Sequence, residues 1–182
     1  ADTIVVFMMT APEKKHKGVT AFIVETDKPG FARGKKEPKL GIRASATSEI
    51  IFDNYECPVE NRLGAEGEGF KIAMSMLDGG RIGVAAQALG VMRAAFEESV
   101  RYAQQRHAFG GPLSKLQAVQ FKLAEMATEL EAATQMVRYA AWLHGAGRPH
   151  HKEAAMAKLF ATEAAATICD QAARVFASYG FA

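Results

Sequence analysis

Residues 116–140 read LQAVQFKLAEMATELEAATQMVRYA, and their apolar residues recur at alternating spacings of three and four. The apolar positions are Leu116, Val119, Leu123, Met126, Leu130, Ala133, Val137 and Ala140. This period matches the α-helix, so the stretch predicts a long amphipathic helix with one buried face. Gly145, Gly147 and Pro149 end the pattern, as glycine and proline do at helix ends.

Similar patterns stand on both sides of this stretch, and the helical part of the chain is expected from Gly69 onward. The earlier pattern has Ile82, Ala85, Leu89, Met92, Phe96, Val100 and Ala103. The later pattern has Met156, Leu159, Phe160, Ala164, Thr167, Ile168, Gln171 and Val175, with a glycine stop expected at Ser178-Tyr179-Gly180. Three long helices with short connections predict an antiparallel bundle, and a fourth would close it.

The first 56 residues have a different pattern, typical of short β-strands. The expected strands are Thr3–Met9, Val19–Glu25 and Ser48–Phe52, separated by segments rich in Pro, Gly and Lys at Ala11–Lys17 and Asp27–Lys39. Asn54–Arg62 is expected to be a crossing loop. These strands predict a small sheet or barrel. Its abrupt first strand leads us to expect that the chain starts partway through a domain.

The predicted fold class is therefore α+β. A partial β-sheet or barrel domain over residues 1–58 is followed by an antiparallel helical bundle over residues 59–182, with three of four long helices present.

Composition excludes several classes of function. The chain has 182 residues, 49% of them apolar, and a net charge of +2 from 22 basic and 20 acidic side chains. Such a balance gives no electrostatic basis for nucleic-acid binding, and no apolar run has the length of a membrane span. The first residues lack the features of a signal peptide, so the expected location is the cytosol.

The cysteines and histidines do not predict a metal site. Cys57 and Cys169 lack the spacing of a metal site or a redox pair, and we expect buried thiols in a reducing compartment. His150 and His151 are adjacent and cannot both face one ion from a helix, so a solvated turn is expected there.

The stretch RHAFGGPL at residues 106–113, followed by Gln117, is the strongest candidate for a ligand site. Arg106, Phe109 and Gly110 place a fixed cation, an aromatic face and a flexible glycine side by side. Guanidinium donors match phosphate oxygens, and the ring can lie against a planar group. The alternative is an ordinary helix end, where Arg and Gly are common.

The stretch LDGGRIG at residues 77–83 lies at the start or in the early turns of the first long helix. Two adjacent glycines inside a helix cost about 1 kcal/mol each relative to alanine. A kink or a close helix–helix approach accounts for them equally well as a ligand passing near the backbone. In the second case Asp78 and Arg81 are the polar anchors.

Taken together, these motifs resemble the flavin-dependent acyl-CoA dehydrogenases, especially their short-chain members. The segments that carry the resemblance are 18–24, 39–47, 51–54 with Pro58, 69–74, 77–83, 87–90, 106–110, 116–126 and 152–158. They follow the family's order over almost the whole chain.

The resemblance implies an enzyme that oxidises a short or modified acyl-CoA to the trans-2-enoyl-CoA. In the family a glutamate removes the alpha proton, the beta carbon passes a hydride to FAD, and electrons leave through an electron-transferring flavoprotein. Members usually form tetramers. Residues 1–58 then correspond to the C-terminal part of the middle β domain, and residues 59–182 to most of the C-terminal bundle. The implied location is the bacterial cytoplasm, or the mitochondrial matrix in a eukaryote.

The resemblance also implies roles for particular residues. Arg106, Phe109 and Gln117 correspond to positions that contact FAD, in the family the flavin of the neighbouring subunit. The substrate-binding segment comprises Asp78, Gly79, Gly80 and Arg81. No metal ligands are implied.

The sequence departs from the family pattern at two places. Most relatives carry the base glutamate in a segment beyond Ala182, and a minority carry it at the position of Gly80, which cannot accept a proton. Glu97, Glu98, Glu125 and Glu129 are expected on the bundle surface. A flavin-contacting Gln-x-x-Gly-Gly motif is replaced by residues 174–178, Arg-Val-Phe-Ala-Ser.

We therefore predict no catalytic residue in this chain and no activity for it in isolation. The alternatives are a non-catalytic assembly scaffold and a flavin oxidase on the same fold. Arg106, Phe109 and Gln117 argue against the scaffold, whereas Gly80 and the altered residues 174–178 favour it.

Overall fold

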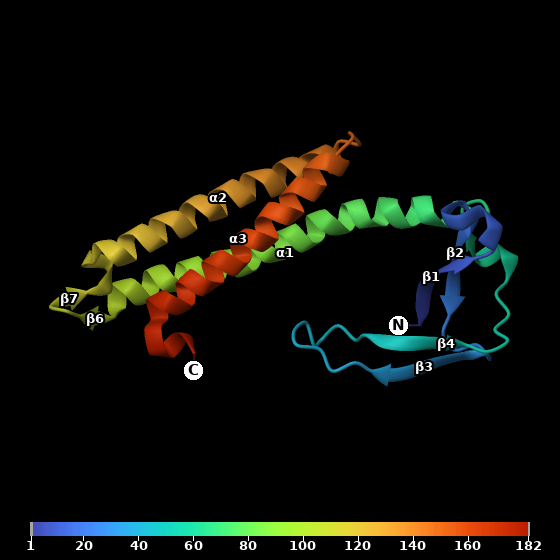
Figure 1. The fold of residues 1–182 in the computed structure, drawn as a ribbon, viewed down its shortest axis with the longest axis horizontal. Helices are drawn as coiled ribbons and strands as arrows, with labels where there is room; N and C mark the ends of the chain where they lie inside the picture. The colour runs from blue at the N-terminus through green and yellow to red at the C-terminus, as the bar shows by residue number, and fades with distance from the viewer. Residues whose placement is uncertain (1, 182) are drawn as a thin grey trace. The chain divides into compact units, whose positions relative to one another are not determined.

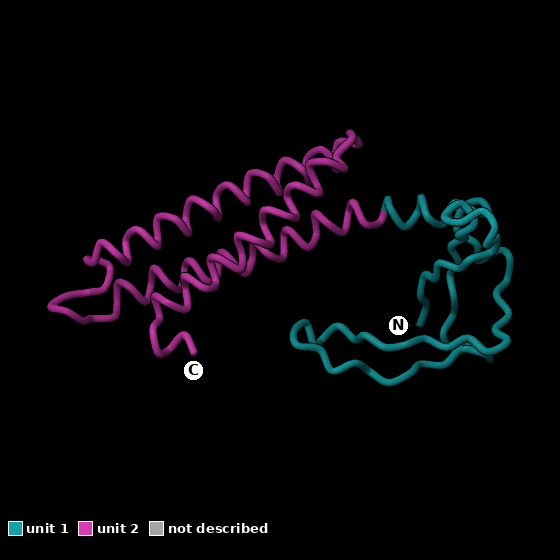
Figure 2. The backbone as a smooth tube through the Cα atoms, viewed as in Figure 1, with its two compact units in different colours: residues 1–75 teal, residues 76–182 magenta. Residues whose placement is uncertain are grey.

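The computed structural model describes residues 2–181. The chain divides into two compact units, Ala1–Ser75 and Met76–Ala182 (Figure 2). The first unit contains the β-strands of the N-terminal part, and the second contains most of the helical residues, so the α+β fold class is confirmed. No helix among residues 2–181 is both long and apolar enough to cross a membrane.

The first unit is built around a three-stranded antiparallel sheet with strand order β1-β2-β5. Its strands are β1 (Thr3–Met9), β2 (Val19–Glu25) and β5 (Arg62–Leu63), and η1 (Pro12–Gly18), a 3₁₀ segment, joins the first two. The predicted ranges of β1 and β2 are confirmed to the residue. β2 is the central strand, and Ala21 and Val24 on it are fully buried. Successive side chains of a strand point to opposite faces, and Val5, Phe7 and Met9 of β1 lie on its exposed face.

A second, two-stranded sheet pairs β3 (Phe31–Lys36) with β4 (Ser48–Phe52). The prediction of β4 is confirmed, but placing residues 31–36 in a connecting segment was wrong. Its lysines and Gly34 give residues 31–36 the composition of a loop. The strand forms by pairing with β4, where Phe31 lies opposite Phe52. Arg62 was likewise expected in a loop, and pairing with Phe22 places it in β5.

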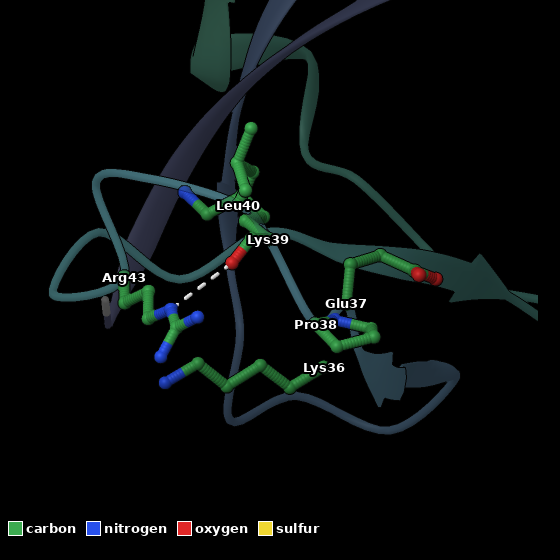
Figure 3. A pocket seen from close by; sticks show the side chains of 6 residues that line it. All are labelled: Lys36, Glu37, Pro38, Lys39, Leu40 and Arg43. Carbon is green, nitrogen blue, oxygen red and sulfur yellow. Dashed lines mark hydrogen bonds between the residues drawn. The ribbon is translucent and has the colours of Figure 1, made fainter. Parts of the chain in front are cut away.

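The loop between β3 and β4 forms a basic hollow (Figure 3). It is lined by Lys36, Glu37, Pro38, Lys39, Leu40 and Arg43. Arg43 Nε donates to the Lys39 carbonyl oxygen at 3.2 Å, and Lys39 Nζ donates to the Ser45 carbonyl oxygen. Backbone carbonyls therefore hold two of the cations in place.

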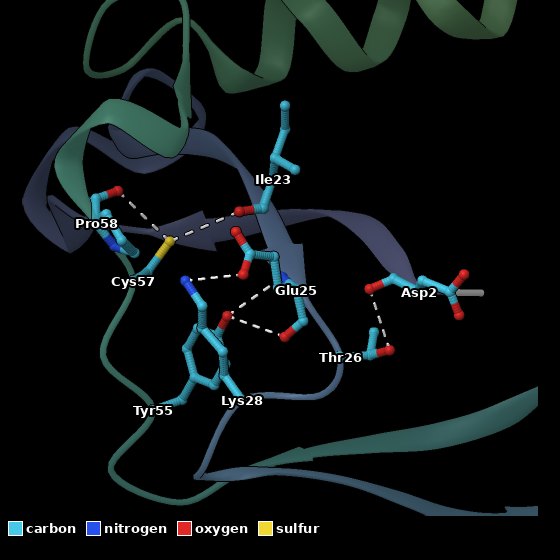
Figure 4. Close-up of polar contacts among 8 residues, drawn as sticks. All are labelled: Asp2, Ile23, Glu25, Thr26, Lys28, Tyr55, Cys57 and Pro58. Carbon is cyan, nitrogen blue, oxygen red and sulfur yellow. Dashed lines mark hydrogen bonds and ion pairs between the residues drawn. The ribbon is translucent and has the colours of Figure 1, made fainter.

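Tyr55 ties the connection after β4 to the end of β2 (Figure 4). Its hydroxyl donates to the Glu25 carbonyl oxygen at 3.0 Å and accepts from the Glu25 amide at 3.2 Å. Lys28 also makes a hydrogen bond to the Glu25 side chain, and this bond raises the pKa of the Lys28 ammonium above its usual 10.5.

Cys57 is half-buried beside this network and Cys169 is half-buried in the bundle, so the expectation of buried thiols was wrong.

The described residues contain three long α-helices (Figure 1). These are α1 (Gly69–Gln105), α2 (Gln117–Gly145) and α3 (His151–Phe176). Shorter 3₁₀ segments are η2 (Val59–Asn61), η3 (Leu113–Lys115) and η4 (Ala177–Gly180). The predicted helices and the break between α2 and α3 are confirmed. α2 and α3 run antiparallel, and Lys122 Nζ near the start of α2 donates to Gln171 Oε1 near the end of α3 at 2.7 Å.

The three helices share one apolar core. α1 contributes Ala85 and Met92, and α2 contributes Met126, Ala133, Val137 and Ala140. These positions follow the predicted stripes, because a spacing of three and four keeps side chains on one helix face.

The buried stripe of α3 differs from the prediction. Ala164, Ile168 and Val175 are buried as predicted. In the first half of the helix, however, alanines are buried, whereas Met156, Leu159 and Phe160 are exposed. Alanine has little side-chain volume, so an alanine face lets two helices pack closely and turns the larger residues outward. Apolar size alone therefore identified the wrong face in the first half of α3.

The end of α3 also differs from the prediction. The helix stops at Phe176 because Ala177 takes a left-handed φ of 53°, and no glycine provides the stop. Gly180 has another role, since a Cβ there would lie 2.4 Å from the Ala173 carbonyl oxygen. Its missing side chain lets η4 fold back against α3.

Candidate functional site

The candidate ligand turn is a β-hairpin between α1 and α2. Strands β6 (His107–Ala108) and β7 (Gly111–Pro112) pair with Ala108 opposite Gly111. The two residues between the strands, Phe109 and Gly110, have φ of 56° and 87°. Positive φ at both central residues is what a type I′ hairpin turn requires. The sequence indicated a turn here, but the short hairpin was not predicted.

Phe109 is held in a costly conformation with no packing reason in this chain. Its side chain is 90% exposed, and a bulky residue with positive φ is a genuine outlier. Four other non-glycine residues among residues 2–181 also have positive φ, and the hairpin turn is the structural cause at Phe109. The ring is therefore presented outward and free to meet a planar ligand.

Arg106 and Gln117 flank the hairpin on its two sides. Arg106 follows the last residue of α1, and its carbonyl oxygen accepts from the Leu113 amide at 2.9 Å, which closes the hairpin. Gln117 is the first residue of α2. Both side chains are exposed, and neither has an ion pair or side-chain hydrogen bond among residues 2–181. The structure thus gathers the three predicted cofactor residues around one hairpin.

This set of groups fits a phosphate-bearing, aromatic cofactor such as FAD. An unpaired guanidinium can donate two parallel hydrogen bonds to phosphate oxygens. The exposed Phe109 ring offers a face or an edge to a flat ring system. The Gln117 amide can both donate and accept.

The double-glycine segment lies within α1, in its third turn, and the helix continues unbroken from Gly69 to Gln105. A Cβ added at Gly79 or Gly80 would meet nothing within 4 Å. A close helix–helix approach within this chain therefore does not explain these glycines. They leave an open strip of helix backbone.

Asp78, beside these glycines, is tied to two cationic or polar partners. Its Oδ1 accepts from Arg81, one turn later on α1, and lies 2.7 Å from Nδ1 of His151 at the start of α3. Asp78 and Arg81 are half-buried, while His151 is mostly exposed. Sequence reasoning missed the His151 contact, because no periodicity relates residues 73 positions apart.

The two candidate segments are far apart along α1. Twenty-four residues separate Arg81 from Gln105, which at a rise of about 1.5 Å per residue gives about 36 Å. Arg81 and the residues of the hairpin are therefore not neighbours within this chain.

The remaining predicted positions have varied surroundings. Glu97, Glu98 and Glu125 are exposed, as expected. Glu129 is different, because its Oε2 is buried and has no hydrogen-bond partner in the described part of the chain. Arg174, in the altered motif, pairs with Asp170 at 2.8 Å.

These features define an α+β protein in which a small β-sheet unit is followed by a bundle of long helices with exposed polar and aromatic groups at a hairpin. The chain belongs to the acyl-CoA dehydrogenase family. Residues 67–182 match the family model of the acyl-CoA dehydrogenase C-terminal domain, and residues 1–55 match that of the middle domain.

Individual relatives agree with this assignment. The short-chain specific acyl-CoA dehydrogenase of Rattus norvegicus mitochondria is 51% identical over 181 residues, covering 100% of this chain and 44% of the relative. The solved butyryl-CoA dehydrogenase of Megasphaera elsdenii is 49% identical with a TM-score of 0.97. A chain in a structure of the electron transferring flavoprotein of Acidaminococcus fermentans is 50% identical with a TM-score of 0.97. Both solved matches cover 100% of this chain and 48% of theirs. This chain thus spans about half the length of the relatives it matches.

Proposed function

We propose that this chain is part of an FAD-dependent acyl-CoA dehydrogenase that oxidises a short acyl-CoA to the trans-2-enoyl-CoA. The observation that carries the proposal is Phe109, an exposed ring held at positive φ between Arg106 and Gln117. Similarity to short-chain and butyryl-CoA dehydrogenases supports the substrate class. When bound, FAD supplies the acceptor for the hydride from the beta carbon.

In this proposal the hairpin holds the cofactor. The Arg106 guanidinium donates to the pyrophosphate, the Phe109 ring packs against the cofactor, and the Gln117 amide hydrogen bonds to it from α2. Since Arg81 lies about 36 Å away along α1, we propose that this cofactor belongs to the neighbouring subunit of a tetramer.

The double-glycine segment lines the acyl-CoA site. With no side chain at Gly79 and Gly80, the acyl-CoA can lie directly against the helix. Asp78 fixes the Arg81 guanidinium beside it. Gly80 carries no acid, so we propose that the base glutamate lies in the part of the relatives' length that this chain does not span. The isolated chain is then inactive, and turnover of butyryl-CoA by it with an artificial electron acceptor would contradict this.

Electrons leave through an electron-transferring flavoprotein, a partner supported by the match to a chain in such a structure. The sources of the relatives support a location in the bacterial cytoplasm or the mitochondrial matrix. We also propose that the middle β domain ends at residue 58 and that the bundle domain begins at residue 59, which limited proteolysis can test.

The test of the cofactor site is Arg106→Ala in the full-length protein. Loss of a hydrogen bond to a charged group costs about 1.5–3 kcal/mol, so FAD affinity should fall about 10- to 100-fold with the fold intact. Arg101→Ala is the matched control, because Arg101 is an exposed arginine on α1 that pairs with Glu98. Equal FAD affinity in both variants would refute the site.

The test of the reaction is anaerobic addition of butyryl-CoA to the FAD-loaded full-length protein. Rapid bleaching of the oxidised-flavin absorbance is expected. Gly80 and residues 174–178 favour one alternative, a non-catalytic scaffold. In that case butyryl-CoA causes no bleaching and Arg106→Ala has little effect.

A further inference from the structure

The turn that joins α2 to α3 can be followed in Figure 1. Within it the imidazole rings of His144 and His150 lie close together. His144 Nδ1, in the last turn of α2, lies 3.1 Å from His150 Nε2, and the ring centroids are 4.7 Å apart. The sequence drew attention to the neighbours His150 and His151. The structure instead pairs His150 with His144, while His151 turns to Asp78.

The tautomer of His150 is set by the backbone. Its Nδ1 lies 2.9 Å from the Arg148 carbonyl oxygen, which can only accept, so Nδ1 carries the hydrogen. The lone pair of His150 is therefore on Nε2, directed at His144. Histidines that bind metals are commonly oriented in this way, by donating their other N–H to a backbone carbonyl.

The distance between the two nitrogens suits a shared metal ion. At metal–nitrogen distances of about 2.05 Å, a 3.1 Å separation corresponds to an angle of about 98° at the metal. This value lies between the square-planar and tetrahedral angles that copper, nickel and zinc adopt. In the metal-free protein the same pair forms one hydrogen bond, with His144 Nδ1 as donor. On metal binding that hydrogen moves to Nε2 of His144, which leaves the Nδ1 lone pair for the ion.

Backbone hydrogen bonds brace the turn on both sides of the two histidines. The Arg148 amide donates to the Leu143 carbonyl oxygen at 2.9 Å, and the Ala154 amide donates to the His150 carbonyl oxygen at 2.8 Å. His144 is exposed and His150 is half-buried, so an ion can enter and keep water ligands.

We propose that His144 and His150 form a binding site for a divalent transition metal of the zinc, nickel and copper type. Within residues 2–181 no cluster of three or more His, Cys, Asp and Glu side chains is placed to hold a metal, so water completes the coordination. Imidazole nitrogens favour these ions over Mg²⁺ and Ca²⁺, which take oxygen ligands. The bound ion links the end of α2 to the start of α3.

Trp142 provides a direct test. It is the chain's single tryptophan, two residues before His144, and Arg148 lies 5.3 Å from its ring centroid. In the full chain without a histidine tag, one equivalent of Cu²⁺ should quench Trp142 fluorescence. Excess Zn²⁺ should compete with Cu²⁺ and restore the emission, and Mg²⁺ should not.

Variants identify the ligands. His144→Ala and His150→Gln should each lower Cu²⁺ and Zn²⁺ affinity at least about tenfold, since loss of even an outer-shell partner costs that much. His107→Ala is the matched control, because His107 Nδ1 also lies against a carbonyl two residues earlier but has no ring partner among the described residues. Circular dichroism checks the fold. Absence of quenching in the unmodified chain, or equal affinity in all three variants, would overturn the proposal.

Discussion

Replacing Phe109 by glycine should stabilise the protein and weaken its hold on FAD at the same time. The left-handed conformation costs a non-glycine residue about 1–2 kcal/mol. Glycine removes this cost, but about 0.5–1 kcal/mol of the gain is lost because glycine has more conformational freedom in the unfolded chain. Because the Phe109 ring is 90% exposed, its removal forfeits little packing in this chain. The net gain in the free energy of unfolding should be about 0.5–1 kcal/mol.

The effect on FAD has the opposite sign. An aromatic contact is worth about 0.5–1.5 kcal/mol beyond the area it buries, so FAD affinity should fall about 2- to 10-fold. Urea unfolding of the chain measures stability, and FAD titration of the full-length protein measures binding. The expected gain of about 0.5–1 kcal/mol in the free energy of unfolding corresponds to a rise in Tm of about 1–4 °C for a protein of this length.

Phe109→Ala separates the two effects. Alanine removes the ring but keeps a Cβ at positive φ, so it should weaken FAD binding like glycine without the gain in stability. A Phe109→Gly variant less stable than the unmodified chain would refute the strained-turn argument. Unchanged FAD affinity in both variants would refute the role of the ring.

The remaining predictions concern packing. Gly79→Ala should raise the free energy of unfolding by about 1 kcal/mol, because its Cβ meets nothing within 4 Å, while it weakens acyl-CoA binding in the full-length protein. Gly69→Ala should lower the free energy of unfolding by about 1–3 kcal/mol, because its Cβ would lie 2.7 Å from the backbone of Thr20. Equal urea midpoints for Gly79→Ala and Gly69→Ala would contradict these opposite effects. Ile168→Ala should cost about 2–5 kcal/mol, because Ile168 is fully buried in the shared core, and a loss below 1 kcal/mol would show that the core lies elsewhere.

Much of the candidate site was predictable because it rests on local chemistry. Arg106, Phe109 and Gln117 lie within twelve consecutive residues, so one hairpin brings them together. The left-handed φ of Phe109 was not predictable, because only the pairing of Ala108 with Gly111 requires it. The contact between Asp78 and His151 was not predictable either, because it depends on how α3 packs and no sequence spacing relates the two residues.

Local sequence pattern was enough to predict the three long helices and the strands β1, β2 and β4. Helix and strand periodicities are properties of neighbouring residues, and they survive whatever the chain later packs against. Long-range contacts were needed to form β3 and to select the alanine face of α3. Each of these depends on which distant segment lies opposite: β4 supplies the hydrogen bonds of β3, and α2 selects the small face of α3. Local pattern sets the elements, and long-range packing sets their partners.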